Sequence, residues 1–231
     1  MKRFYRDVSV AHSAGGYSIA LDGKPVKTPL GAPLAMRNAA LADAIAEEWR
    51  GQDTKIVPAS MPLTKLVNTA IDGVMPRREA VIAEIAAYAR HDHLCYRAEA
   101  PRELAERQHA DWDPLLEWAG KRYGARLATG TGVAHIEQPD EAVAALRRAM
   151  ESFDPFMLAA LHAATSILGS LVLAMALAEE RLDAAQAFAL SQLDERYQAE
   201  KWGVDAEAES RARRLEVELA AAARFMVFLR A

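Results

Sequence analysis

Three short segments of the sequence contain residue types that could take part in catalysis or binding. The first contains residue types that bind metal ions. His91, His93 and Cys95 lie close together, and imidazole and thiolate groups are common zinc ligands. On a helix His91 and Cys95 would share one face while His93 points elsewhere, and no second cluster has zinc-like spacing. The group therefore favours a helix end, where histidine suits the helix dipole, and we predict no metal site and no cofactor.

Signals for other kinds of catalysis are weak. The run Thr129–Gly132 lacks the lysine of a phosphate-binding loop, and no Gly-x-Ser-x-Gly nucleophile motif occurs in the sequence. Cys95 stands between Leu94 and Tyr96, which indicates an inert buried thiol. The alternative function that stays open is a small hydrolase using Asp/Glu pairs, or a metal-dependent enzyme using His91 and Cys95.

The most unusual charged segment is Asp194–Glu209, which contains six acids, two bases and two aromatic residues, Tyr197 and Trp202. In one interpretation Gly203 breaks a helix and Asp205 caps the next one. In the other, the segment is an acidic surface with aromatic anchors that binds a basic or polar patch of a partner. The residues alone leave both interpretations open.

The first sixty residues have the pattern of a small β-rich domain. The dipeptide Asp22-Gly23 separates two alternating runs, residues 17–21 and 24–28, which predicts a β-hairpin with a tight turn. A first helix is expected over Asn38–Trp49, with the asparagine as its N-cap.

From Met61-Pro62 onward the pattern is mainly helical. Asp113-Pro114 and Asp154-Pro155 each predict an N-cap followed by the first residue of a helix. The last predicted helix keeps an apolar seam that suits a helical bundle.

These elements define the predicted fold class. We expect an α+β fold, with a small β-rich N-terminal domain containing one helix over residues 1–70. A mainly helical, bundle-like C-terminal domain follows over residues 71–231, and the boundary is expected between about residues 55 and 80.

Composition excludes several classes of protein. The 231 residues carry 28 basic and 32 acidic side chains, a formal net charge of −4. A net-acidic chain without a block of Lys and Arg is not expected to bind nucleic acid. The single cysteine rules out an intrachain disulfide framework and favours a reducing compartment. The 49 alanines predict a mostly helical protein.

One segment is long and apolar enough to raise the question of a membrane span. Phe156–Ala178 has 23 residues without a formal charge. It contains His162 and several hydroxyl side chains, and no basic residue flanks it to set an orientation. We therefore expect it to be the core helix of the second domain, with no stable membrane insertion.

An ordered set of motifs gives the sequence a family resemblance. The motifs are Lys2–Val8, Leu21–Pro29, Glu48-Trp49, Met61–Leu66, Asn68–Asp72, Cys95–Ala98, Trp112–Leu116, and the C-terminal group Asp194, Glu195, Gln198, Trp202, Gly203, Asp205, Glu207 and Ala208. Together they resemble the ATP synthase assembly chaperones that handle the alpha subunit of the catalytic head (the Atp-twelve type). The resemblance spans nearly the whole chain in order.

The resemblance implies a non-enzymatic function. Members of this family bind the unassembled alpha subunit and shield the surface that it later gives to the beta subunit. The expected partner is therefore the ATP synthase alpha subunit, and we expect this chain to act as a monomer. The lack of a presequence pattern implies a bacterial, cytoplasmic relative, whereas eukaryotic relatives are expected in the mitochondrial matrix.

The resemblance also favours the partner-binding interpretation of the acidic segment. Val204 departs from the family pattern, since an acid is expected at this position in many relatives. The expected partner-binding residues are Asp194, Glu195, Gln198, Glu200, Trp202, Asp205 and Glu207. No catalytic residue is expected.

Overall fold

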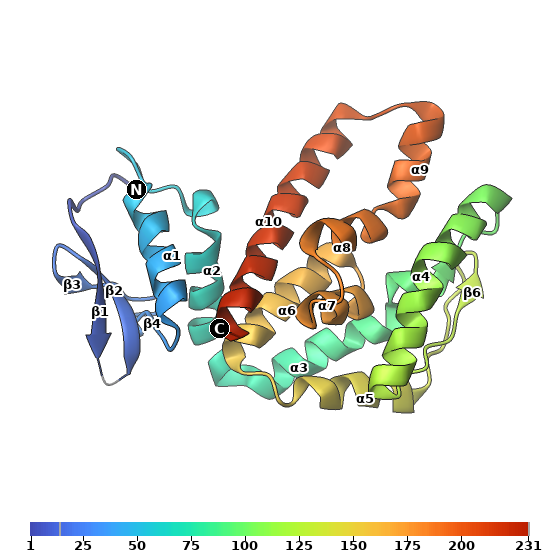
Figure 1. The fold of residues 1–231 in the computed structure, drawn as a ribbon, viewed down its shortest axis with the longest axis horizontal. Helices are drawn as coiled ribbons and strands as arrows, with labels where there is room; N and C mark the ends of the chain where they lie inside the picture. The colour runs from blue at the N-terminus through green and yellow to red at the C-terminus, as the bar shows by residue number, and fades with distance from the viewer. Residues whose placement is uncertain (14, 231) are drawn as a thin grey trace. The chain divides into compact units, whose positions relative to one another are not determined.

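The computed structural model describes residues 1–13 and 15–230, and the chain forms two compact units. Unit 1 comprises Met1–Arg78, Phe153–Ala160 and Arg224–Ala231, and unit 2 comprises Glu79–Ser152 and Leu161–Ala223. The α+β fold is confirmed, since the small antiparallel sheet lies in the first part of the sequence and helices follow it (Figure 1).

Unit 1 begins with a small antiparallel sheet. Its strands are β1 (Val8–Ser13), β2 (Gly16–Leu21), β3 (Lys24–Pro25) and β4 (Ala35–Met36), in the order β1-β2-β3 with β4 also paired to β2. Leu21 pairs with Lys24 across a turn in which Asp22 (φ +48°) and Gly23 (φ +76°) both have left-handed backbone angles. These are the angles that a two-residue hairpin turn requires, so the predicted hairpin is confirmed.

Helix α1 (Ala39–Arg50) packs against β1 and β2 and forms the core of unit 1 with them (Figure 1). Asn38 caps it as predicted, because its side-chain oxygen accepts a hydrogen bond from the Leu41 N–H at 2.8 Å. Ile19 from the sheet and Leu41 and Ile45 from the helix are fully buried. Removal of this apolar surface from water is the main term that holds the helix on the sheet.

A half-buried carboxylate joins α1 to the next helix. Glu48 accepts hydrogen bonds from the N–H groups of Leu63 (2.7 Å) and Thr64 (2.8 Å) and from the Thr64 hydroxyl (2.7 Å). It thereby satisfies the first turn of α2 (Pro62–Asn68), whose N–H groups have no partner within the helix. A π-helical turn, Thr69–Val74, continues from α2.

Two later segments complete unit 1. Residues 153–160 and 224–230 belong to it, and the rings of Phe156 and Phe225 stack with centroids 6.5 Å apart. Unit 1 is therefore assembled from three separate segments of the sequence. The division into residues 1–70 and 71–231 stays a prediction of domain organisation.

Unit 2 consists mainly of helices. They are α3 (Arg78–Ala87), α4 (Arg102–Tyr123), α5 (Asp140–Met150), α6 (Pro155–Leu168), α7 (Leu171–Ala178), α8 (Ala184–Ser191), α9 (Leu193–Trp202) and α10 (Ala206–Arg230), and α3, α6 and α10 also contribute residues to unit 1. Two short strands, β5 (Tyr96–Arg97) and β6 (Gly130–Thr131), pair in parallel. The predicted cap at Asp154 is confirmed, since its carboxylate accepts from the Met157 N–H at 2.8 Å.

Helix α7 is the centre of unit 2, because all eight of its residues are buried. Its first turn is closed by two side chains: the Asp92 carboxylate accepts from the Val172 N–H (3.1 Å), and the Ser170 hydroxyl accepts from the Leu173 N–H (3.1 Å). Asp92 is itself fully buried, and this desolvation raises the pKa of its carboxyl.

The expectation of one core helix over Phe156–Ala178 is wrong in detail. The segment forms two helices, α6 and α7, because Gly169 takes a left-handed conformation (φ +63°) and Ser170 caps a new helix. In the part of the chain that the structure describes, residues 1–13 and 15–230, no helix has the length and apolar character needed to cross a membrane.

The predicted helix start at Asp113-Pro114 is also wrong. Helix α4 runs continuously from Arg102 to Tyr123 with Pro114 inside it. Trp112 (0% exposed) and Leu115 (4% exposed) flank the proline and are buried. Their burial offsets the roughly 3 kcal/mol that an internal proline costs a helix.

The stacked phenylalanines give a test of the three-segment unit. Phe225→Ala should destabilise unit 1 by about 3–5 kcal/mol, because a fully buried ring is lost and a cavity remains. Hydrogen exchange of the amides of α1 and β2 would measure this effect locally. Val227→Ala, at a half-exposed position of the same helix, should change stability by less than about 0.5 kcal/mol. Unchanged protection in the Phe225 variant would contradict the assignment of residues 224–230 to unit 1.

Candidate partner-binding groove

The acidic segment singled out in the sequence forms two helices and the turn between them. Helix α9 ends at Trp202, and Gly203 then takes a positive φ of +93° that favours glycine. The Asp205 carboxylate accepts hydrogen bonds from the N–H groups of Glu207 (2.8 Å) and Ala208 (3.0 Å) at the start of α10. The predicted helix break at Gly203 and cap at Asp205 are therefore confirmed.

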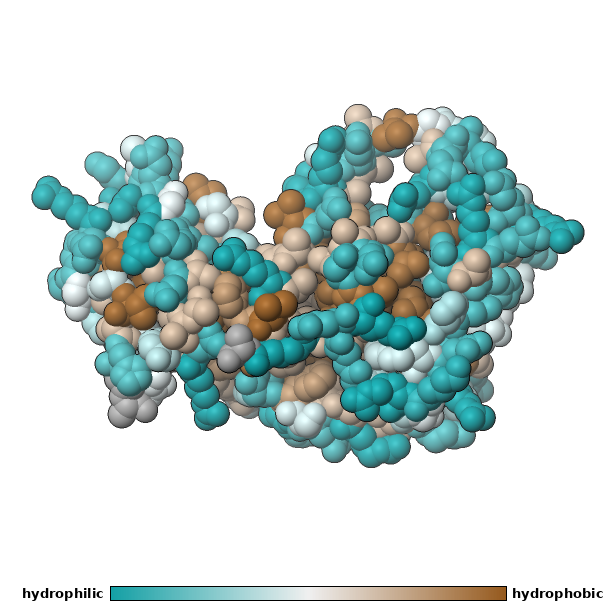
Figure 2. Space-filling view, viewed as in Figure 1, coloured by the Kyte–Doolittle hydropathy of each residue, from teal (hydrophilic) through white to brown (hydrophobic). Residues whose placement is uncertain are grey.

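Helices α8, α9 and the first half of α10 surround an open groove of about 590 Å³ within unit 2. Figure 1 shows the chain rising along α9 and returning along α10, and Figure 2 shows the molecule hollowed between them. Phe188 and the small residues Ala189 and Ala212 contribute apolar surface to its lining. The groove is therefore wide enough to accept a side chain or a short segment of another protein.

Helix α9 presents two different faces. Glu195, Gln198 and Trp202, spaced three and four residues apart, line the groove. Asp194 and Tyr197 lie on the other face, toward α4: Asp194 accepts a hydrogen bond from the Gln108 amide (2.7 Å), and the Tyr197 hydroxyl bonds to Glu103 (3.2 Å).

Ion pairs strengthen the contact between α9 and α4. Glu200 pairs with Arg107 at 2.7 Å, and Lys201 pairs with Glu103 at 2.9 Å. The hydrogen bond from Lys201 holds the pKa of the Glu103 carboxyl below its ordinary value. These charged groups are exposed and therefore weak individually, but together with Asp194 they fix which face of α9 is left free.

A hydrogen-bonded chain connects Asp194 to the interior of unit 2. Its partner Gln108 is buried, and the Gln108 side-chain carbonyl accepts from the Ala98 N–H at 2.7 Å. The Gln108 backbone carbonyl accepts from the buried Arg97 guanidinium, which also pairs with Asp113 at 2.6 Å. Asp194 is thus a positioning residue for α9.

The charge of the groove is mostly negative. Its lining contains Glu195, Asp205, Glu209 and Glu216 against one base, Arg196. Glu209 is paired with Arg213, which is outside the groove lining, at 3.0 Å, and Asp205 caps α10, whereas Glu195 and Glu216 are exposed acids of the lining. A groove of this kind favours a basic or polar partner surface.

Exposed apolar residues stand at the end of the groove. Trp202 is 77% exposed and Val204 is 65% exposed, and Figure 2 shows apolar surface at the turn between α9 and α10 amid hydrophilic residues. Tryptophan is the residue type most enriched at the centres of protein interfaces. An exposed tryptophan beside an acidic groove is therefore the strongest candidate anchor in unit 2.

The structure separates the seven predicted partner-binding residues into three groups. Glu195, Gln198, Trp202 and Asp205 line the groove, whereas Asp194 and Glu200 bond to α4. Glu207 is exposed outside the groove lining, and its backbone N–H bonds to Asp205. All seven remain proposals as partner-binding residues.

The residues of α8 and α10 that line the groove were not among the partner-binding residues predicted from the sequence. Phe188 comes from α8 and Gln192 from the junction of α8 and α9, and Glu209, Ala212 and Glu216 come from α10 at spacings of three and four. The helical spacing on α10 was visible in the sequence. The contribution of α8 was not, because it depends on how the helices pack.

The residues of the proposed metal-dependent alternative do not converge on a shared site. The His91 ring packs against His135 with centroids 5.3 Å apart, and Cys95 is buried, which raises the pKa of its thiol to about 12. His93 packs against Trp112 instead. Within the described ranges 1–13 and 15–230, no three His, Cys, Asp or Glu side chains are grouped so as to hold a metal ion.

Comparison with known proteins defines the class of protein. The family model described as "ATP12 chaperone protein" matches residues 2–120. "Protein atp12, mitochondrial" of Schizosaccharomyces pombe is 29% identical over 216 residues, which cover 87% of this chain and 74% of that protein.

Solved structures show the same relationship over the full fold. The crystal structure of Atp12 from Paracoccus denitrificans matches with a TM-score of 0.93 and 40% identity, covering 98% of this chain and 97% of that one. A protein from Agrobacterium tumefaciens matches with a TM-score of 0.94 and 44% identity, covering 99% and 86%. The chain belongs to the ATP12 chaperone family, the family of ATP synthase assembly chaperones.

Substitutions at two neighbouring residues of α9 should have different effects on stability, because the two side chains lie on different faces of the helix. Asp194→Ala should destabilise unit 2 by about 1–3 kcal/mol, because it leaves the buried Gln108 amide without its acceptor. Glu195→Ala, one residue further on and exposed, should change stability by less than about 0.5 kcal/mol. Urea unfolding followed by circular dichroism would measure both, and equal effects would contradict the two-faced arrangement of α9.

The Asp205 cap should be dependent on pH. The hydrogen bonds from Ala208 and Glu207 lower the pKa of its carboxyl below the ordinary 3.8. Its contribution to stability is therefore present above pH 3.8 and is lost as the pH falls through the lowered pKa. Asp205→Ala should lower the melting temperature at neutral pH, and the difference from the wild type should vanish in strong acid. A difference that persists there would contradict the cap, and Glu218→Ala, at an exposed acid away from the end of the helix, is the control.

Proposed function

We propose that this protein is an assembly chaperone that binds the unassembled alpha subunit of the F-type ATP synthase catalytic head. It keeps that subunit from aggregating until the beta subunit replaces the chaperone. The observation that carries the proposal is the open, acid-lined groove between α8, α9 and α10, with Trp202 exposed beside it. Membership of the ATP12 chaperone family supports it.

The physical argument begins with the client. A subunit made before its partner exposes an apolar interface, and such surfaces self-associate. A groove with an apolar lining and an exposed tryptophan can cover part of that surface. The acids around it, Glu195 and Glu216 among them, select a client patch that is basic or polar at its edge.

The groove also suits temporary binding. Its acids are exposed to solvent, so their attraction to a basic client is screened by salt and speeds association more than it raises affinity. The beta subunit can then displace the chaperone by covering a larger interface. No nucleotide hydrolysis is needed for such an exchange, and the proposed role is non-enzymatic.

The test is an aggregation assay with isolated alpha subunit. Wild-type protein should suppress light scattering at near-equimolar ratio. Trp202→Ala should weaken binding about 30-fold, the effect of losing an interface hot spot. Glu195→Lys should also protect poorly, because it reverses a charge in the groove.

Glu218→Lys is the matched control, since it makes the same charge change at an exposed position of α10 outside the groove lining. It should protect as the wild type does. Wild-type protein that fails to slow aggregation would refute the proposed function. If folded Trp202 and Glu195 variants protect fully, the alpha subunit binds elsewhere on the chain.

A further inference from the structure

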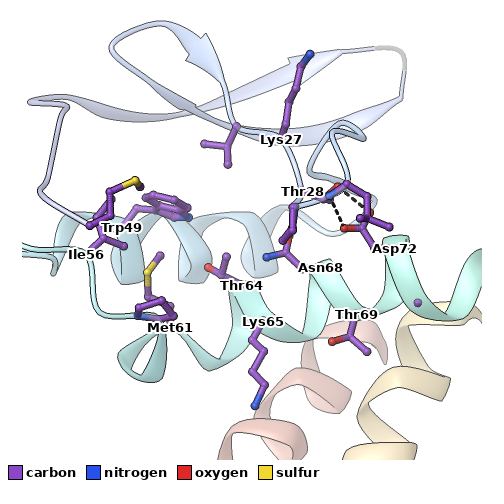
Figure 3. Close-up of a pocket in the computed structure, with 16 residues that line it drawn as sticks. Lys27, Thr28, Trp49, Ile56, Met61, Thr64, Lys65, Asn68, Thr69 and Asp72 are labelled. Carbon is purple, nitrogen blue, oxygen red and sulfur yellow. Dashed lines mark hydrogen bonds between the residues drawn. The ribbon is translucent and has the colours of Figure 1, made fainter.

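Unit 1 contains a second cavity that the proposed groove does not use. It has a volume of about 730 Å³ and is lined entirely by residues of the first 73 positions, from α1, α2, the π-helical turn after α2 and the loops beside them (Figure 3). Three sequence motifs that carried the family resemblance meet there: Lys27–Pro29, the α2 residues Thr64-Lys65, and Asn68–Asp72. We call this cavity the unit 1 cleft.

The unit 1 cleft is apolar inside and at its edge. Ile56 and Met61 are buried in its lining. Met1 and Leu30, which also line it, are 76% and 79% exposed. Large apolar side chains left in solvent around an apolar cavity mark a surface that binds another molecule.

Two lysines lie on opposite sides of the cleft. Lys27 and Lys65 extend away from each other in Figure 3, and among residues 1–13 and 15–230 neither forms an ion pair. The acid of the lining, Asp72, is hydrogen-bonded: its carboxylate accepts from the Thr28 hydroxyl (2.7 Å) and the Leu30 N–H (3.0 Å). Both donors are neutral and leave its charge in place, so the lining has two basic side chains against one acidic one. The excess charge of the cleft is therefore positive, with a lysine at each flank.

The walls also contain a hydrogen-bond donor and an acceptor without partners. The Trp49 indole N–H and the Asn68 side-chain oxygen are buried and have no partner in the described part of the chain. Unpaired buried polar groups are uncommon in folded proteins and cost free energy. Trp49 and Asn68 both line the cleft, so we expect small shifts of lining side chains to bring these atoms into contact with an occupant.

These features define the occupant. An extended polypeptide offers a free C=O for the Trp49 indole and a free N–H for Asn68, whereas a helix uses these groups internally. Its apolar side chains would fill the cleft, and acidic side chains on either flank would reach Lys27 and Lys65.

We propose that the unit 1 cleft is a second docking site, which takes an extended apolar segment of the client polypeptide flanked by acidic residues. The inference rests on the proposed function, because the client is the unassembled alpha subunit. The groove of unit 2 favours a basic or polar patch, so the two sites select different segments of the same client.

The contribution of the two lysines can be tested by measuring the binding of isolated alpha subunit to the full chain with biolayer interferometry. The double variant Lys27→Glu/Lys65→Glu should weaken binding about tenfold and reduce its dependence on salt. The matched control is Lys24→Glu/Lys55→Glu, which makes the same charge change at exposed positions of unit 1 outside the cleft. The control should bind as the wild type does.

A second pair of variants tests the unpaired indole. Trp49→Phe keeps an aromatic ring but removes the donor, and it should weaken binding about threefold to tenfold. Trp118→Phe, the same change in unit 2, should have no effect. Circular dichroism and hydrogen exchange confirm that each variant is folded.

Photocrosslinking identifies the occupant. A benzoylphenylalanine at position 30, on the cleft edge, should link to one segment of the alpha subunit with apolar residues between acids. The same group at position 133, fully exposed in unit 2, should give no such product. A crosslink to a helical or basic segment would overturn the proposal, as would unchanged binding by the lysine double variant and Trp49→Phe.

The outcomes separate the two proposals. If wild-type protein does not bind the alpha subunit, the proposed function fails and takes this inference with it. If the wild type binds and the Trp202 and Glu195 variants are weakened while all cleft variants bind normally, only the second docking site is refuted.

Discussion

Helix α7 imposes the constraint on which unit 2 depends. Its eight residues are all buried, so it has no face that can meet water and must be surrounded by other helices. Helices α4 and α8 pack directly against it. The N–H groups of its first turn could not be buried without hydrogen-bond acceptors. The Asp92 carboxylate accepts from Val172 and the Ser170 hydroxyl accepts from Leu173, each at 3.1 Å. A carboxylate taken fully out of water is tolerated here because three backbone or hydroxyl donors and the positive end of a helix stabilise its charge.

The groove follows from this arrangement. Since α4 and α8 are held on α7, helix α9 has a fixed surface to bind, and Asp194 and Tyr197 bind it. Its other face, with Glu195 and Trp202, is left without a protein partner in the described residues. The same ten residues therefore supply both a structural contact and an open face. The two interpretations of the acidic segment do not exclude each other: Gly203 and Asp205 end one helix and begin the next, while Glu195 and Trp202 line the groove.

Local features of the fold could be predicted from the sequence, and non-local ones could not. The Asp22-Gly23 turn and the caps at Asn38 and Asp205 depend on a few neighbouring residues, and all three are confirmed. Pro114 misled the prediction because burial around it outweighs its local cost. The acidic segment singled out in the sequence supplies part of the groove lining, but no pattern within one helix reveals that α8 forms the opposite wall. The unit 1 cleft was missed as a cavity, although its motifs were recognised, because they meet only after the hairpin and α2 have packed.

The three-segment composition of unit 1 has a consequence for the order of folding during synthesis. Residues 1–78 leave the ribosome first, but the stacking of Phe156 and Phe225 has to wait until residue 225 has been made and has cleared the exit tunnel. All of unit 2 precedes residue 225 in the sequence, so it can assemble while unit 1 is incomplete. Residues 1–78 are therefore made well before the rest of unit 1, and until residue 225 follows, the unit 1 cleft belongs to an incompletely packed unit. A member of a chaperone family is then itself exposed to aggregation during its own synthesis.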